Sequence, residues 1–108
     1  MSELVEKLSS ADHKVEVSIR PESTPKALAA CIEKGYVHLR FPETRGGTDL
    51  YVPVDRDQCD LSKANFIDGQ GQLRIVGRFS LDFVAVRCIA NIDLASMDGV
   101  GRLERVEA

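Results

Sequence analysis

The apolar residues near the start of the chain recur with the period of a strand. From Lys14 onward every second residue is apolar, at Val15, Val17 and Ile19, and the residues between them are polar. This alternation is typical of a strand with one buried face, because successive side chains point to opposite sides. Pro21 cannot donate a hydrogen bond to a ladder, so we expect the strand to end there.

Residues 25–34 have the pattern of an amphipathic helix with a defined start and end. Thr24 is a favourable N-cap residue, and Pro25 occupies the first helical position, where a missing N–H costs nothing. Gly35 can adopt the left-handed conformation that commonly terminates a helix. The apolar face that we expect to be buried consists of Leu28, Cys31 and Ile32.

Strand periodicity returns in residues 36–41 and again in residues 49–54. A polar loop that contains Gly46 and Gly47 separates the two runs, which predicts a β-hairpin. The apolar sets that we expect to face inward are Val37, Leu39 and Phe41 in the first run and Leu50, Val52 and Val54 in the second.

The pairing of this hairpin is constrained by the requirement that both apolar sets share one face. For a loop of this length we expect Arg40 to lie opposite Tyr51 and His38 opposite Pro53. Because Pro53 has no N–H to donate, the second strand is predicted to have a free edge at that point.

Residues 55–71 are the least regular part of the chain. We expect Leu61, Phe66 and Ile67 to anchor this segment to the core, with one turn of helix over residues 61–65. The segment is rich in aspartates that favour local turn capping, namely Asp55, Asp57, Asp60 and Asp68.

The apolar positions change parity within residues 72–94. They are odd-numbered up to Phe79 and even-numbered from Val84, so an unbroken strand is excluded. A turn or a bulge near residues 80–83 can absorb the change, and a turn is favoured because strands usually span about five or six residues. A further turn at residues 97–99 precedes a final strand over residues 100–106.

These elements predict an α+β fold in a single domain over residues 1–108. About six strands form a mainly antiparallel sheet, either a curled sheet or a partly open barrel, packed against the main helix at residues 25–34. Residues 1–13 carry a few apolar residues at helical spacing, and we expect a short or frayed helix there.

Composition excludes several classes of protein. With 44% hydrophobic residues in 108, the chain can form a core and is not a disordered tail. The formal charge of -3 disfavours nucleic acid as a partner, because such binding draws on a net basic charge. No apolar run approaches the roughly 20 residues of a membrane helix, so no membrane partner is expected.

The cysteines and the N-terminus predict a cytoplasmic location. Cys31, Cys59 and Cys88 are an odd number at wide spacing, which suits neither a disulfide framework nor a zinc site. The first residues are acidic and lack the apolar core of a signal peptide.

No arrangement typical of catalysis or metal binding is present, so we expect a non-enzymatic protein without cofactor or metal. His13 and His38 lack a second ligand at metal-binding spacing and are predicted to be ordinary histidines. The aspartates after residue 54 begin like a calcium loop but lack its glycine and final glutamate. Cys59 has no neighbouring base in the sequence to activate its thiol.

The candidate binding residues are arginines and aromatic residues on one outer sheet face. Arginine and tyrosine together favour recognition of anions and planar groups, through forked hydrogen bonds and stacking. The ordinary alternative is a solvated sheet face balanced by nearby aspartates. The residues that the strand parity predicts on this face are Tyr36, His38, Arg40, Tyr51, Arg74 and Arg78.

One short fragment resembles a known family. Residues 60–65, which read Asp-Leu-Ser-Lys-Ala-Asn, are similar to the D-x-S-x-x-G element of PilZ domains, small β-barrels that bind cyclic di-GMP. Asn65 stands at the glycine position, and the family's R-x-x-x-R element before the first strand is absent. The resemblance implies a cyclic-dinucleotide ligand, contacted by Asp60, Ser62 and Asn65.

Two functions follow from this sequence. The first is a small cytoplasmic, non-enzymatic domain that binds a protein partner, or a second copy of itself, through an exposed sheet face or strand edge. The alternative is a domain that binds a small anion or a nucleotide through Arg40, Arg74 and Arg78.

Overall fold

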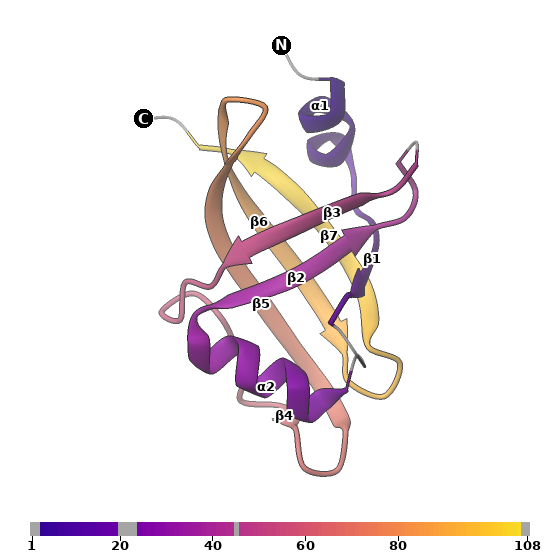
Figure 1. Ribbon diagram of the computed structural model, residues 1–108, viewed down its shortest axis with the longest axis vertical. Helices are drawn as coiled ribbons and strands as arrows, with labels where there is room; N and C mark the ends of the chain where they lie inside the picture. The colour runs from indigo at the N-terminus through magenta and orange to yellow at the C-terminus, as the bar shows by residue number, and fades with distance from the viewer. Residues whose placement is uncertain (1–2, 20–23, 45, 107–108) are drawn as a thin grey trace.

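The protein is an antiparallel sheet of seven strands, curled into a half-barrel, with two helices (Figure 1). The computed structural model describes residues 3–19, 24–44 and 46–106. The elements are α1 (Glu3–Ser10), β1 (His13–Val17), α2 (Pro25–Lys34), β2 (Tyr36–Phe41), β3 (Thr48–Pro53), β4 (Ala64–Asn65), β5 (Gln70–Leu81), β6 (Val84–Asp93) and β7 (Asp98–Arg105). The predicted α+β class and single domain are confirmed.

The strand order is β3-β2-β1-β7-β6-β5-β4, and every neighbouring pair is antiparallel. Figure 1 shows β2 and β3 crossing in front of β5, β6 and β7, so that the sheet forms two layers. The inner faces of both layers enclose the core, and their outer faces point in opposite directions. Residues on β2 and β3 therefore present a different surface from residues on β5, β6 and β7.

The half-barrel closes where the end of β3 meets the middle of β5. The N–H of Asp55 donates to the carbonyl of Val76 over 2.8 Å. At Gly77 a Cβ atom would lie 1.8 Å from the carbonyl oxygen of Pro53 and 2.8 Å from Cγ1 of Val52. Only a glycine allows the two strands to approach this closely.

The core is a single cluster of apolar side chains supplied by both layers and both helices. Phe41 is its largest fully buried side chain. Val5 and Leu8 of α1 are also completely buried, so the N-terminal helix is part of the domain. From α2, Leu28 and Ile32 enter the core, whereas Cys31 is half-buried.

The caps of α2 are those that the sequence predicts. The Thr24 side chain accepts a hydrogen bond from the N–H of Ala27, and Gly35 has φ of 96°. The N–H of Gly35 donates to the carbonyls of Cys31 and Ile32. The helix ends therefore lie at the residues that were expected.

The parity change in the second half of the chain is a two-residue turn, as predicted. Asp82 and Phe83 connect β5 to β6 with φ values of 50° and 65°. Two successive left-handed residues define the turn that suits the twist of a hairpin, and Asn-Gly or Asp-Gly is its preferred sequence. Phe83 is thus a bulky residue in a backbone conformation that favours glycine, and its side chain is fully exposed at 106%.

Replacing Phe83 by glycine should therefore stabilise the fold. Relief of the left-handed strain outweighs the added freedom of the unfolded chain, and we expect a gain of about 0.5–1 kcal/mol in the free energy of unfolding. Urea denaturation measures the change. Ile67→Gly is the matched control, because Ile67 is 97% exposed and does not have positive φ; there the glycine should destabilise. Equal effects of the two substitutions would contradict the assignment of strain to Phe83.

Four local expectations are wrong. The turn expected at residues 97–99 lies at residues 94–97, because Asp98 and Gly99 already pair with β1 and β6 as part of β7. In the β2–β3 hairpin Arg40 lies opposite Asp49 and His38 opposite Tyr51, an offset of two positions from the expected pairing. The turn of helix expected over residues 61–65 is absent, because Ala64 and Asn65 pair with β5 as the short strand β4. Ile67 is exposed rather than an anchor, whereas Leu61 and Phe66 do pack against the core.

Pro21, at which we expected the first strand to end, lies outside the described residues; β1 ends at Val17. In residues 3–19, 24–44 and 46–106 no helix is both long enough and apolar enough to cross a membrane.

Candidate functional site

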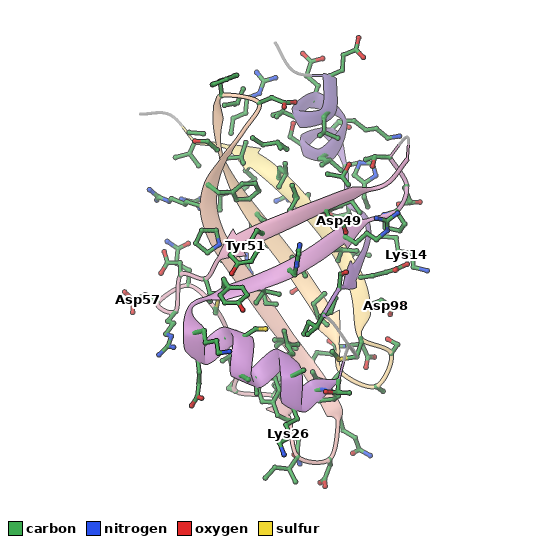
Figure 2. The ribbon with its side chains drawn as sticks, in the orientation of Figure 1. Lys14, Lys26, Asp49, Tyr51, Asp57 and Asp98 are labelled. Atoms are coloured by element: carbon green, nitrogen blue, oxygen red, sulfur yellow. The ribbon has the colours of Figure 1, made fainter. Side chains whose placement is uncertain are left out.

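An aromatic cluster lies on the outer face of β2 and β3. The rings of Tyr36 and Tyr51 are stacked, with centroids 4.4 Å apart and an interplanar angle of 15°. His38 meets Tyr51 edge-on, with a centroid distance of 5.5 Å. Tyr51 is 57% exposed, and Figure 2 shows it on the front of the β2–β3 layer. The structure thus brings together three of the six residues predicted from the sequence.

The surroundings of Tyr51 affect the ionisation of its phenol. Partial desolvation, a hydrogen bond with Tyr36 and electrostatic effects of Tyr36 and Cys31 raise the pKa of the Tyr51 phenol, and Lys34 opposes them. The phenol therefore stays protonated through the neutral range and remains a hydrogen-bond donor. Tyr51 thus presents an exposed aromatic ring with a polar tip.

Arg40 continues this surface toward the β2–β3 loop. Its Nη1 atom donates to Oδ2 of Asp49 over 3.0 Å. Its guanidinium also covers Gly47, where a Cβ atom would lie 2.2 Å from Nη2. Arg40 is thus engaged by an acidic neighbour, and the ion pair gives this end of the surface both signs of charge.

Arg74 and Arg78 belong to β5, in the other layer and far from β2 and β3 in the strand order. Both side chains are exposed on the outer face, as the parity predicted. The structure therefore divides the six candidate residues into two surfaces. The β2–β3 surface carries Tyr36, His38, Arg40 and Tyr51, and the β5 surface carries Arg74 and Arg78.

The fragment that resembles the PilZ element forms two separate turns. The N–H and hydroxyl of Ser62 both donate to Oδ1 of Asp60, over 3.0 and 2.6 Å. These hydrogen bonds lower the pKa of the Asp60 carboxyl. Asn65 instead caps the next turn, where its Oδ1 accepts from the N–H groups of Ile67 and Asp68. Asp60 also lines a polar cavity of about 250 Å³ with Lys63, Gln72, Leu73, Arg74 and Asn91.

Cys59 is half-buried and its sulfur is engaged by the backbone. The N–H of Val76 donates to Sγ over 3.2 Å, and the thiol contacts the Val76 carbonyl at 3.5 Å. Burial raises the pKa of this thiol, which keeps it protonated at neutral pH. Cys59 lies beside a cavity of about 220 Å³ whose other lining residues are Ile32, Glu33, Val54, Arg56 and Leu61. The thiol is poorly suited to act as a nucleophile there.

The two histidines have ordinary environments. Nε2 of His13 lies 2.8 Å from the carbonyl oxygen of Lys7, and its Nδ1 is 3.8 Å from Glu43. His38 belongs to the aromatic cluster. Among the described residues no group of three or more His, Cys, Asp or Glu side chains is placed to hold a metal ion.

Burial raises the pKa of the Cys88 thiol from 9.0 to about 12, which makes a prediction for alkaline solution. The unfolded chain can release this proton above about pH 9, but the folded protein cannot. Stability from this group is therefore present below pH 9 and is lost as the pH rises toward 12. Urea denaturation over this range should show a steeper loss for the wild type than for Cys88→Ala. Parallel curves would contradict the prediction.

Several residues on or near these surfaces were not among the site residues predicted from the sequence. Asp49, the partner of Arg40, was not singled out because the expected hairpin pairing placed Tyr51 opposite Arg40. Arg87 and Arg102 project from β6 and β7 beside Arg78, and the parity of their strands was the signal that could have identified them. The exposure of Phe83 could be predicted only from the conformation of the turn.

Comparison with known proteins adds no family to these observations. No protein-family model matches this chain, and none of the curated proteins compared with it gives a significant match. The resemblance to PilZ domains is carried by residues 60–65 alone. The function is therefore inferred from the geometry of the two surfaces.

Proposed function

We propose that this protein is a binding domain that takes an extended protein segment along the edge of β3 and the adjoining aromatic cluster. The segment comes either from a second copy of the chain or from another protein. The observation that carries this proposal is the position of Tyr51, which is exposed, stacked on Tyr36 and located on the edge strand β3. Backbone groups of β3 near Tyr51 point away from the sheet.

The hydrogen-bond pattern shows which backbone groups of β3 are available. Val54 donates to the carbonyl of Gly35, and bonded and non-bonded positions alternate along an antiparallel pair. Leu50 and Val52 therefore direct their N–H and C=O groups toward β2, whereas Asp49 and Tyr51 direct theirs outward. An added strand can form hydrogen bonds with these outward groups.

The surroundings of this edge fit a short extended segment. On one side, Pro53 lacks an N–H and the following residues are tied to β5, so pairing is limited to the first part of β3. On the other side, α1 and the start of β3 border an open cavity of about 570 Å³. Its lining residues are Glu3, Leu4, Lys7, Thr44, Gly47, Thr48 and Asp49.

We also propose that the protein is non-enzymatic and works in the cytoplasm. The raised pKa of Cys59 and its backbone contacts disfavour a nucleophilic thiol. The three cysteines are free, which suits a reducing compartment.

Two substitutions test the binding site, because they remove different parts of it. Tyr51→Ser deletes the aromatic anchor, and Asp49→Pro removes an outward N–H without breaking a bond to β2. We expect each to weaken association at least about tenfold, as is usual when a central aromatic anchor is lost. Ile67→Ser is the matched control, because it removes an apolar side chain that is even more exposed than Tyr51, at 97% against 57%, from a loop tip.

Light scattering over a range of protein concentrations measures self-association, and selection from a library of extended peptides supplies a ligand if the chain stays monomeric. The proposal predicts either self-association or selected peptides that depend on Tyr51 and Asp49 but not on Ile67. A monomer that yields no such peptide would refute it.

A further inference from the structure

The middle of the outer face of β5, β6 and β7 carries an excess of positive charge, whereas the carboxylates of Asp93 and Asp98 lie in the row at one end of it. The alternating residues of these strands that face inward are buried, among them Ile75, Cys88 and Leu103. Their neighbours therefore project outward. A row here means a set of outward residues that are paired with one another across the three strands. The three rows nearest the middle of the face contain one carboxylate, that of Glu104, and four arginines, namely Arg74, Arg78, Arg87 and Arg102.

Two of these arginines face each other directly. Arg78 is paired with Arg87 across β5 and β6. The backbone of Arg74 bonds outward to Asp60, so the even residues of β5, Arg78 included, form non-bonded pairs with β6. In such pairs the Cα atoms are only about 4.5 Å apart and the side chains are closest. Like charges directly opposite one another destabilise a sheet.

The acidic partners nearby do not balance this pair. Glu104 is shared, because it lies 3.9 Å from Nη1 of Arg87 and 3.5 Å from Nη2 of Arg102. Nε of Arg87 is shut off from solvent and has no hydrogen-bond partner. Within the described ranges, no ion pair is formed by Arg78. One carboxylate thus serves the guanidinium groups of Arg87 and Arg102, and it forms no ion pair with Arg78.

We propose that this face is a binding site for a phosphate-bearing small molecule, held by Arg78, Arg87 and Arg102. A phosphate group offers more acceptor oxygens than a carboxylate and suits the forked donors of several guanidinium groups at once. The anion would bring negative charge to Arg78 and reduce the repulsion between Arg78 and Arg87, of which only Arg87 is paired with Glu104. Ile89 lies between these arginines, paired with Arg102 and half-buried, and offers an apolar contact to the rest of the ligand.

This site is independent of the β2–β3 surface. It lies in the other layer and uses none of the residues of the aromatic cluster. Its loss would leave the proposed protein-binding edge intact, and the two proposals can fail separately.

The test uses the full chain and inorganic pyrophosphate as the probe. Calorimetric titration at constant ionic strength should detect binding to the wild type. We expect Arg78→Gln and Arg87→Gln each to weaken the affinity at least about tenfold, since each removes a charged hydrogen-bond donor from the phosphate oxygens. Lys26→Gln on α2 is the matched control, because it removes the same charge elsewhere (Figure 2). Tyr51→Ser should also bind pyrophosphate normally.

The melting temperature of the unliganded protein provides a second readout. If Arg78 serves a ligand rather than the fold, Arg78→Gln removes a like-charge repulsion and should raise this temperature while it weakens binding. The proposal is overturned if the wild type does not bind pyrophosphate or if Lys26→Gln weakens binding as much as the two arginine variants. It is also overturned if Arg78→Gln lowers the melting temperature.

Discussion

Gly77→Ala should lower the free energy of unfolding by about 3 kcal/mol, although it adds only one methyl group. The new Cβ would lie 1.8 Å from the carbonyl oxygen of Pro53, a backbone atom that cannot rotate away. Accommodating it requires β3 to move away from β5. That movement strains the 2.8 Å hydrogen bond from Asp55 to Val76, which closes the half-barrel.

Urea denaturation followed by circular dichroism measures this change. Gly101→Ala is the matched control, since Gly101 is also buried in the sheet but its added Cβ would be no closer than 3.2 Å to any neighbour. We expect Gly101→Ala to cost clearly less. If the two substitutions have equal effects, the close approach of β3 and β5 at Gly77 is not what demands a glycine.

Phe41→Ala should be similarly damaging, with an expected loss of about 4 kcal/mol. Phe41 is the largest fully buried side chain, and it lies on β2 between the two layers. Removing its ring takes away apolar contacts and leaves a cavity that the strands on either side cannot fill completely.

Phe83→Ala is the natural comparison, because it truncates the same side chain at a fully exposed position. We expect it to change the free energy of unfolding by less than about 0.5 kcal/mol. A large loss at Phe83, or a small one at Phe41, would contradict the assignment of the core.

The elements that the sequence predicts well are those with local signals. Helix α2 has Thr24 at its start and Gly35 at its end, so both boundaries are determined by neighbouring residues. The turn between β5 and β6 is required by the parity of the apolar residues, because side chains alternate strictly along a strand. Neither prediction depends on contacts between distant parts of the chain.

The pairing of β2 with β3 could not be predicted in this way. A shift of two positions leaves every side chain on the same face, so apolar alternation does not distinguish the two pairings. The structure indicates what selects one of them. The hydroxyl of the buried Thr44 contacts the Phe41 carbonyl at 3.1 Å and the Thr48 hydroxyl at 2.6 Å, which tightens the loop. Arg40 then forms its ion pair with Asp49.

The candidate surfaces could be predicted only in part, because the sequence indicates the face on which a residue lies but not the order of the strands. Strand parity places Tyr36, Tyr51 and Arg78 correctly on outer faces. The parity of the residues does not show which strands are neighbours. The prediction therefore combined residues from both layers into one site. The separation depends on the strand order and on the closure at Gly77, which are both long-range properties.

Hydrogen exchange at individual amides of β3 tests the proposed binding edge most directly. In the free monomer the N–H groups of Asp49 and Tyr51 should exchange quickly, because they point away from β2, whereas those of Leu50 and Val52 should be protected. Addition of a selected peptide, or an increase in protein concentration, should protect Asp49 and Tyr51 specifically. Association that leaves these two amides exchanging at their free rates would contradict the account.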